Sequence, residues 1–487
     1  MKKIILSMLC VANVFIHANS QTTNDTLVNP IHGYIEGYNA QDFEKMRNSM
    51  SGLLKLVFTE KRLEQIYSLQ YEMIGSATID SLIQKGNSRS YLANLKYIRD
   101  TTEIQTMGFY ISKKNKIIGL SNPSYKFQFS KNDSLAPISE KSALFSIDSI
   151  VNLKHNAANF NGCILVLKNK KVFYEQCEGY ADFETKSPLN DSTMFDLASC
   201  SKQFTAMAIM ILQEQGKLRY DNTVNDFFPD FPYKNITIEN LLTHTSGLPD
   251  YMELLDKHWD KNKVATNKDI LEYLIKYKPK AIFKPGKEYE YSNTGYAMLS
   301  LIIEQASGKS FSEFLSANIF QPLGMKHSRV YNTRYSENEI LINRANGHTF
   351  SSDSMQYLPV SKIPELDYYI YMDGVTGDGA INSTITDLAI WDNSLRTYQL
   401  VSKETFDRAI QPYKTEDGEL SNYGYGWEIQ NDSKYESLIY HSGNWGGNIT
   451  FILHFLDKDL SVIILSNNEY FNTPKFAAKV AEIMNRL

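Results

Sequence analysis

Residues 195–212, FDLASCSKQFTAMAIMIL, join a short polar cluster to a long apolar run. The run predicts a buried helix from Phe204 to Gln215. Residues three apart lie on one face of a helix, so Lys202 would lie one turn from Ser199 on the same side. Two interpretations follow: Ser199 caps the helix and Lys202 is solvated, or Ser199 is a nucleophile and Lys202 is its base.

The second interpretation has a chemical basis. A serine hydroxyl is a weak nucleophile until a neighbouring base removes its proton, and a lysine serves where burial or nearby positive charge lowers its pKa. A helix N-terminus also offers N–H groups to a developing oxyanion. Ser199 and Lys202 form the only Ser-x-x-Lys in the chain, but this spacing alone does not exclude an ordinary helix cap.

A second motif, Tyr291-Ser292-Asn293, lies in the stretch EYEYSNTGYAML before an expected helix from Gly295 to Gln305. A tyrosinate, or a tyrosine that shares its proton with a lysine, can act as a general base, and an asparagine amide can orient a lysine and a substrate. Tyr-x-Asn also occurs elsewhere in the chain, at Tyr220 and Tyr233 for example, so a plain helix cap at Ser292 or Asn293 is the alternative.

A third motif, His441-Ser442-Gly443, lies in the stretch YHSGNWGG. Glycine lets a strand backbone approach a ligand closely, and histidine near neutral pH can be a cation, a donor or an acceptor. The alternative is a glycine-rich turn that carries a surface histidine.

In this order the three motifs resemble those of the serine β-lactamase and penicillin-binding-protein superfamily, which carries Ser-x-x-Lys, Ser-Asp-Asn and Lys-Thr-Gly. Tyr-Ser-Asn in place of Ser-Asp-Asn is similar to the class C β-lactamase, D-alanyl-D-alanine carboxypeptidase and esterase branch. His-Ser-Gly replaces Lys-Thr-Gly, a variant of the peptidase-like and esterase-like members. The resemblance extends over residues 141–487 and includes LLTHTSGLPDY, IFQPLGMKHS, GDGAINSTITDLAIW and YGYGWEI.

The resemblance implies a role for each matching residue. Ser199 would form an acyl-enzyme, Lys202 and Tyr291 would move the proton, and Asn293 would hold Lys202 and the substrate amide. His441, followed by Ser442 and Gly443, would stand where the family lysine meets a substrate carboxylate. The backbone N–H groups of Ser199 and Asn444 would form the oxyanion hole. His244 would belong to the scaffold near the site.

This resemblance implies a serine hydrolase: a peptidase, esterase or β-lactamase acting on an amide or ester, with a D-amino-acid peptide from the cell wall or a β-lactam as candidates. It implies neither a metal nor an organic cofactor. A charged His441 would make kcat/KM fall as pH rises through roughly 6.5. One alternative is a catalytically silent sensor that binds peptidoglycan fragments or β-lactams, and another is an interaction protein. Pocket shape would come from residues 251–280 and 332–374.

Strand signals at both ends of this region indicate its architecture. Residues 160–182 read as a hairpin around KNKK, and residues 448–469 as another that turns at residues 457–459, before a last helix from Thr473 to Leu487. These signals predict one antiparallel sheet built from both ends of an α+β domain, with a helical insertion. The resemblance implies the β-lactamase/transpeptidase-like fold, in which helices flank the sheet and form a subdomain.

The length of 487 residues predicts two domains after a leader. Residues 1–20 contain two leading lysines, an apolar run and small residues before a cleavage point at Gln21, as in a signal peptide. This leader predicts a secreted or periplasmic protein. Lipidation at Cys10, the less favoured alternative, would attach the protein to a membrane. Residues 21–140 read as a small α+β domain, with helices at 31–50 and 58–75 and strands at 91–98, 102–112 and 115–120. This pattern resembles the cystatin-like and nuclear-transport-factor-like cone domains. Residues 130–141 read as the linker to the domain at 141–487.

The net charge and the cysteine content limit the kinds of binding partner that we expect. The net charge of −5 gives no basic footprint, so nucleic acid is not an expected partner, whereas a small molecule or a peptide is. No Cys-x-x-Cys or Cys/His metal spacing is present in the sequence. Cys163 and Cys177 flank the first expected hairpin and would be either a disulfide or two buried thiols.

Overall fold

The structure is a computed structural model that forms two compact units, residues 1–125 and 126–487. It describes residues 25–51, Lys55, Glu60, Leu63, Glu64, Tyr67, Tyr71, and 75–84, 90–98, 104–112, 115–121, 136–156, 160–332, 341–351, 356–363, 366, 368–416, 418, 420–432, 436–469 and 471–487. The expected signal peptide with Cys10, most of the expected helix at 58–75 and the first part of the expected linker lie outside these residues.

In the described part of the first unit, helices α1 (Asp25–Ala40) and α2 (Phe43–Asn48) come before a four-stranded antiparallel sheet. Its strands are β1 (Ala77–Gln84), β2 (Ser90–Tyr97), β3 (Ile104–Ile111) and β4 (Ile117–Ser121), which pair in chain order. The expected helix at 31–50 breaks because Gln41 has a positive φ of 53° and the Asp42 carboxylate caps α2. The sequence pattern does not predict strand β1.

Tyrosines fill the core of this unit. Tyr34 and Tyr38, one turn apart on α1, are buried against Tyr67 and Tyr97. The hydroxyl of Tyr34 donates to that of Tyr67 over 2.7 Å, and the hydroxyl of Tyr38 donates to the carbonyl of Gly75 over 2.9 Å. Each buried hydroxyl therefore has a partner, which removes the cost of burying it unpaired.

The boundary between the units comes before the expected one at 140/141. Residues that were expected to form a linker pack on the C-terminal end of the chain: the N–H of Ile138 donates to the carbonyl of Arg486 over 3.0 Å, and the Arg486 guanidinium donates to the carbonyl of Ala136. Helix α5 (Glu140–Asn156) follows directly and contacts α17 (Thr473–Met484). These contacts tie the segment to the second unit.

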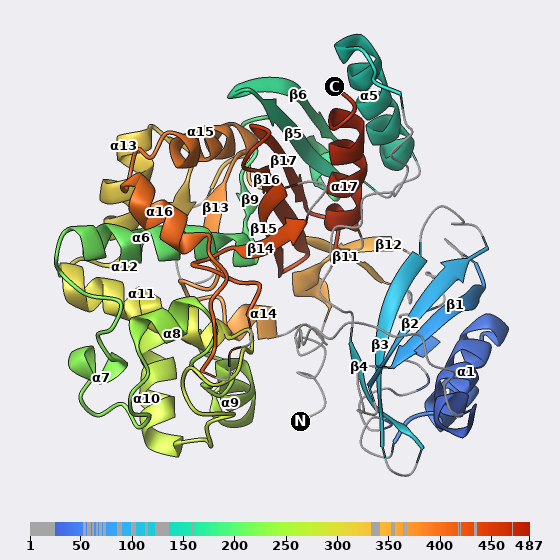
Figure 1. The fold of residues 1–487 in the computed structure, drawn as a ribbon, viewed down its shortest axis with the longest axis horizontal. Helices are drawn as coiled ribbons and strands as arrows, with labels where there is room; N and C mark the ends of the chain where they lie inside the picture. The colour runs from blue at the N-terminus through green and yellow to red at the C-terminus, as the bar shows by residue number, and fades with distance from the viewer. Residues whose placement is uncertain are drawn as a thin grey trace. The chain divides into compact units, whose positions relative to one another are not determined.

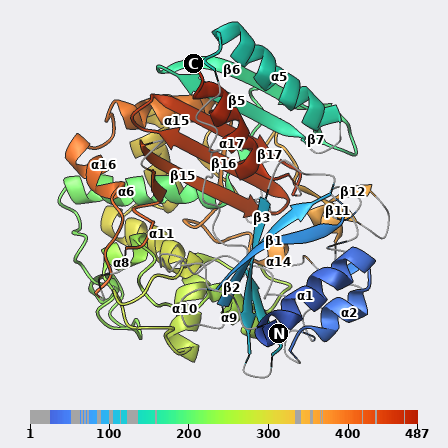
Figure 2. The same ribbon diagram turned by 45° about the vertical axis from the view of Figure 1, so that its right-hand side comes forward.

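The second unit is built on a six-stranded antiparallel sheet in the order β14-β15-β16-β17-β5-β6 (Figures 1 and 2). Its early strands are β5 (Gly162–Lys168) and β6 (Lys171–Glu178), and its late strands are β14 (Glu428–Asp432), β15 (Glu436–Trp445), β16 (Asn448–Phe455) and β17 (Leu460–Ser466). β17 pairs with β5, which joins the two expected hairpins. The prediction of one sheet from both ends of the region is therefore confirmed.

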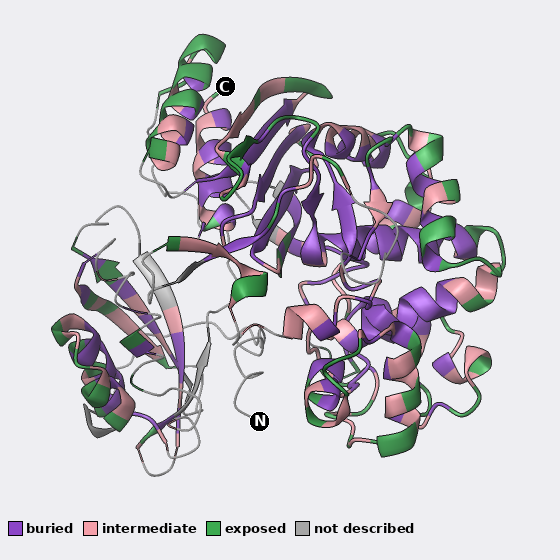
Figure 3. Cartoon of the chain, turned by 180° about the vertical axis from the view of Figure 1, so that it is seen from behind, coloured by how far each residue is buried: buried purple, intermediate pink, exposed green. Residues whose placement is uncertain are grey.

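Helices cover both faces of this sheet. In β5 and β17, Leu165 and Ile463 belong to the large core that includes Trp391 of α15 (Ile385–Arg396), whereas the alternate residues Ile164 and Ile464 lie outside that cluster. Successive strand residues point to opposite faces, so α15 and α17, which both contact β17, lie on opposite sides. Figure 3 shows the central strands buried along their length, as expected for a sheet between two helical layers.

The remaining elements lie between β6 and β14 in sequence. Figure 1 shows α7 to α11 gathered to one side of the sheet, and α11 packs directly on α6. The helices are α6 (Lys202–Glu214), α7 (Val224–Phe227), α8 (Ile238–Leu242), α9 (Tyr251–His258), α10 (Asn267–Tyr277), α11 (Asn293–Ser307), α12 (Phe311–Leu315), α13 (Gln321–Leu323), α14 (Tyr368–Tyr371) and α16 (Lys403–Ala409), with the short turns η2 (Ala198–Ser201), η3 (Ser316–Phe320) and η4 (Val360–Lys362). The short strands are β7 (Tyr180–Asp182), β8 (Ser187–Pro188), β9 (Phe195–Asp196), β10 (Arg329–Val330), β11 (His348–Ser351), β12 (Gln356–Pro359) and β13 (Ile381–Ser383).

Two features bear on the sequence-based alternatives. Cys163 and Cys177 lie directly opposite each other on β5 and β6 and form a disulfide, the first of the two alternatives. Among the described residues, no helix combines the length and the apolar character needed to cross a bilayer.

Candidate active site

Ser199 lies in a tightly held turn between the short strand β9 and helix α6. The preceding residue, Ala198, has a left-handed φ of 48°, a conformation that costs a non-glycine residue free energy. The Asp196 carboxylate compensates by accepting the N–H of Ala198 over 2.8 Å. On the other side, the N–H of Ile381 in β13 donates to the Ser201 hydroxyl over 3.1 Å. The position of Ser199 is therefore fixed by its neighbours on both sides.

Lys202 is the hydrogen-bond partner of Ser199. Its side chain is fully buried, and Nζ donates to the Ser199 hydroxyl over 3.0 Å and to the carbonyl of Asp378 over 2.7 Å. Burial lowers the pKa of Lys202 to about 8, against the opposing effect of the Asp378 charge. These contacts are incompatible with the alternative in which Lys202 is a solvated side chain.

Tyr291 completes the group around the serine. Its phenol lies beside the Ser199 side chain, and Lys202 Nζ lies 5.0 Å from the centre of its ring. Burial raises the pKa of Tyr291 well above its usual range. The residue is therefore a phenol at neutral pH, which favours a proton shared with Lys202 over a standing tyrosinate.

The next two residues of this motif begin helix α11. Ser292 is its N-cap and accepts the N–H of Gly295 over 3.2 Å, so capping and placement of Tyr291 occur together. Asn293 follows as the first residue of the helix. No hydrogen bond between Asn293 and Lys202 is seen among the described residues, where Lys202 Nζ donates to Ser199 and to the carbonyl of Asp378.

His441 lies on β15, inside the sheet, rather than on a surface turn. Its Nδ1 is 2.7 Å from the carbonyl of Ser442, and its Nε2 is 2.8 Å from the hydroxyl of Tyr423. A carbonyl can only accept, so Nδ1 carries the proton and Nε2 accepts from Tyr423. Burial, together with the charge of Lys202, lowers the pKa of His441 to about 3. In the free protein His441 is therefore neutral rather than charged as expected, and its contact with a substrate carboxylate stays a prediction.

The glycine of the same motif has a packing role. A Cβ on Gly443 would come within 2.3 Å of the carbonyl oxygen of Leu197 and within 2.3 Å of Thr450 Oγ1. Only glycine lets β15 come this close to the turn that carries the serine. The side chains of Ser442 and Asn444 are exposed on the strand on either side of it.

The backbone around Ser199 has donors in the expected place. The N–H groups of Ala198 and Cys200 are bonded to Asp196 and Leu197, but within the described part of the chain the N–H of Ser199 has no partner. A free N–H beside a nucleophile is what an oxyanion hole requires. The pairing of the N–H of Asn444 with this group stays a prediction.

The sequence does not predict two contacts that the structure shows in the site. Asp378 binds Lys202 through its carbonyl, and its carboxylate accepts from the hydroxyl of Tyr251 over 2.9 Å. The hydroxyl of Tyr423 lies 2.8 Å from Nε2 of His441 and is its hydrogen-bond partner. Both residues lie in stretches that carry the family resemblance, GDGAINSTITDLAIW and YGYGWEI, but neither stretch contains a residue pattern that indicates these bonds.

A buried lysine bonded to a serine, beside a phenol, defines a serine hydrolase whose base is not histidine. The Beta-lactamase family model matches residues 154–483, more than half of the chain. The chain belongs to the beta-lactamase family and is a serine hydrolase of that family.

Individual relatives agree with this assignment. The chain is 40% identical over 310 residues to "Penicillin-binding protein 4*" of Bacillus subtilis (strain 168), over 64% of this chain and 68% of the relative. It is 28% identical to "Protein flp" of Staphylococcus aureus (strain MW2), over 68% of this chain and 64% of the relative. The octameric penicillin-binding protein homologue from Pyrococcus abyssi has the same fold, with a TM-score of 0.60 and 28% identity over 70% of this chain and 77% of that structure. The chain thus spans about two thirds of the length of both curated relatives.

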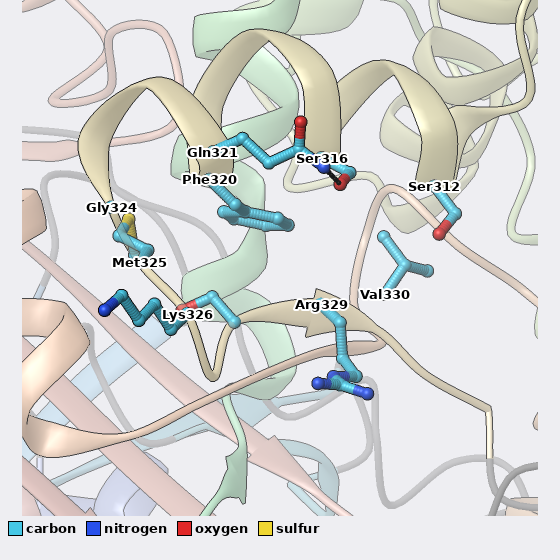
Figure 4. A pocket seen from close by; sticks show the side chains of 10 residues that line it. Ser312, Ser316, Phe320, Gln321, Gly324, Met325, Lys326, Arg329 and Val330 are labelled. Atoms are coloured by element: carbon cyan, nitrogen blue, oxygen red, sulfur yellow. Dashed lines mark hydrogen bonds between the residues drawn. The ribbon is translucent and has the colours of Figure 1, made fainter.

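A cavity of about 480 Å³ lies elsewhere in the second unit, between η3, α13 and β10 (Figure 4). Its lining includes Phe320, Met325 and Lys326 and contains none of the residues around Ser199. The chemistry described above therefore belongs to a different part of the unit.

Proposed function

We propose that this protein hydrolyses an amide or an ester through an acyl-enzyme on Ser199. The observation that carries the proposal is the 3.0 Å contact between the Ser199 hydroxyl and a fully buried Lys202, whose pKa is lowered to about 8. Such a lysine is partly neutral at physiological pH and can accept the serine proton.

The steps follow from the contacts. The Ser199 oxygen attacks the carbonyl carbon while its proton passes to neutral Lys202, and the resulting oxyanion meets the N–H groups of Ser199 and Asn444. The tetrahedral species collapses, the bond to the leaving group breaks, and the Tyr291 phenol supplies the leaving group's proton while Lys202 returns its proton to Tyr291. Water then hydrolyses the acyl-enzyme and restores the serine.

The substrate class we propose is an amide or ester, with a D-amino-acid peptide of the cell wall as a candidate. The names of similar proteins support this range, since they include penicillin-binding proteins, a D-amino acid amidase and the hydrolase EstCE1. The neutral His441 supports substrates whose binding does not depend on an imidazolium paired with a carboxylate. The leader-like residues 1–20 support action outside the cytoplasm.

The test is covalent labelling of the full chain with a fluorophosphonate probe, read by intact mass and by peptide mapping. We expect one adduct, on Ser199, and its loss in Ser199→Ala. Ser192→Ala is the matched control, because Ser192 is an exposed serine that bonds only to neighbouring residues, and it should label normally. Undiminished labelling of Ser199→Ala would refute the nucleophile. Labelling of Ser199 by a β-lactam without turnover of any ester or amide would favour the sensor alternative.

A further inference from the structure

His244 holds the chain on both sides of Tyr291. Its carbonyl accepts the N–H of Glu290 over 2.9 Å, and its ring Nδ1 accepts the N–H of Ser292 over 3.0 Å. One residue therefore binds the two backbone groups that flank the phenol-bearing residue. A side chain without an acceptor at the position of Nδ1 could make only the first of these bonds.

The ring of His244 also supports the phenol directly. The ring centres of His244 and Tyr291 are 4.2 Å apart with the planes tilted by 34°, and the histidine ring also packs against Tyr296 and Tyr423, at 5.1 and 4.4 Å between ring centres. The side chain is fully buried, so this packing leaves it little freedom. The backbone of His244 has a φ of 58°, in the left-handed region where histidine and asparagine are enriched and bulky residues are disfavoured.

The protonation state agrees with this arrangement. Because Nδ1 accepts a backbone N–H, the ring proton is on Nε2. Burial, together with the charge of Lys202, lowers the pKa of His244 well below its usual value, so the ring stays neutral. A neutral ring cannot serve here as a second cation, and Nε2 has no hydrogen-bond partner among the described residues.

We infer that His244 is a positioning residue that aims the Tyr291 phenol at Ser199. The inference rests on the proposed function, and it goes beyond it by giving a residue outside the three motifs a share in the proton transfer. Misplacing a proton donor by about 1 Å costs on the order of 10²-fold in rate. The cost should fall on the step in which the phenol protonates the leaving group, because that step needs the donor in place.

Two substitutions separate the acceptor from the ring. His244→Asn keeps an acceptor close to the position of Nδ1 and tolerates the left-handed backbone, but loses the ring. His244→Phe keeps a ring but loses the acceptor. His244→Ala removes both without adding bulk, and it serves if the phenylalanine variant fails to fold. Thermal melting of each variant establishes that it is folded before its rates are compared.

The assay compares p-nitrophenyl butyrate with ethyl butyrate on the full chain. A p-nitrophenolate leaves without a proton, whereas ethoxide needs one, so a misplaced phenol should slow only the second substrate strongly. We expect His244→Phe and His244→Ala to lose on the order of 10²-fold in kcat for ethyl butyrate, with KM nearly unchanged, and less than about tenfold for the p-nitrophenyl ester. His244→Asn should stay within about fivefold for both, and Tyr291→Phe should show the same preference as His244→Phe.

Each result decides the matter. Equal losses on the two esters, or no advantage of asparagine over phenylalanine and alanine in folded variants, would overturn the role of His244 and leave the proposed function standing. Wild-type protein that shows no Ser199-dependent turnover of either ester would overturn the proposed function, and the inference with it.

Discussion

The titration of Lys202 should control the rate at which Ser199 is acylated. At a pKa of about 8, about one tenth of Lys202 is neutral at pH 7, whereas a lysine at its usual value would be neutral in about one molecule in three thousand. This increase in the neutral fraction of Lys202 corresponds to about 3 kcal/mol at neutral pH. Acylation should therefore rise about tenfold from pH 7 to pH 9 and level off above that.

Most titratable groups around Ser199 do not titrate in the pH range over which Lys202 changes its charge. Burial keeps the pKa values of His244 and His441 below the neutral range and that of Tyr291 above it. Glu428, whose pKa burial raises to about 7, is the neighbour that could imitate such an inflection. Glu428→Gln is therefore the control, and it should keep the inflection near 8.

A second variant tests the direction in which the charge of Asp378 shifts the pKa of Lys202. The charge of Asp378 raises the pKa of Lys202, so Asp378→Asn should move the inflection to lower pH while keeping the backbone carbonyl that binds Nζ. Asparagine can still accept from Tyr251. The measurement is the rate of fluorophosphonate labelling from pH 5.5 to 10 at constant ionic strength. A rate that falls through pH 6.5, or an inflection that moves upward in Asp378→Asn, would refute the reasoning.

Two further substitutions test the packing around the site. Gly443→Ala should slow labelling of Ser199 on the order of 10²-fold and cost about 1–3 kcal/mol of stability, because its Cβ would press on the Leu197 carbonyl; labelling at the wild-type rate would contradict the close approach. Asp392→Asn should cost about 3–5 kcal/mol in urea unfolding at pH 7, because the fully buried carboxylate binds both Arg396 and His454. The pKa of Asp392 is lowered to about 2, so its contribution is complete above the unfolded value near 4 and is lost as pH falls toward 2. A gap between wild type and variant that stays constant down to pH 2 would contradict this.

Much of the catalytic unit could be predicted from local pattern. The hairpins at both ends are apolar runs around polar turns, and the antiparallel pairing of β5 with β17 joins them as expected. The spacing of Ser199 and Lys202 places both on one face of a turn, and the structure adds the hydrogen bond. These features depend on residues that are near one another in sequence.

What the sequence did not predict depends on burial and on long-range contacts. A charged His441 is what its residue type predicts, but burial in the sheet and the nearby charge of Lys202 lower its pKa. The partner of Lys202 is a backbone carbonyl, at Asp378, and a carbonyl has no signature in the sequence. The segment around Pro137 has the composition of a linker, yet a distant arginine, Arg486, binds its backbone.

The sheet that joins both ends of the second unit also sets the order in which this chain can fold. Strand β5 is apolar along its length and buried on both faces, and its partner β17 is synthesised only after all the helices that separate the two strands in sequence. Until β17 arrives, β5 can pair only with β6 and exposes an open, apolar edge to neighbouring chains. A topology with such distant pairings folds slowly, so the growing chain depends on being kept apart from others until β17 is made.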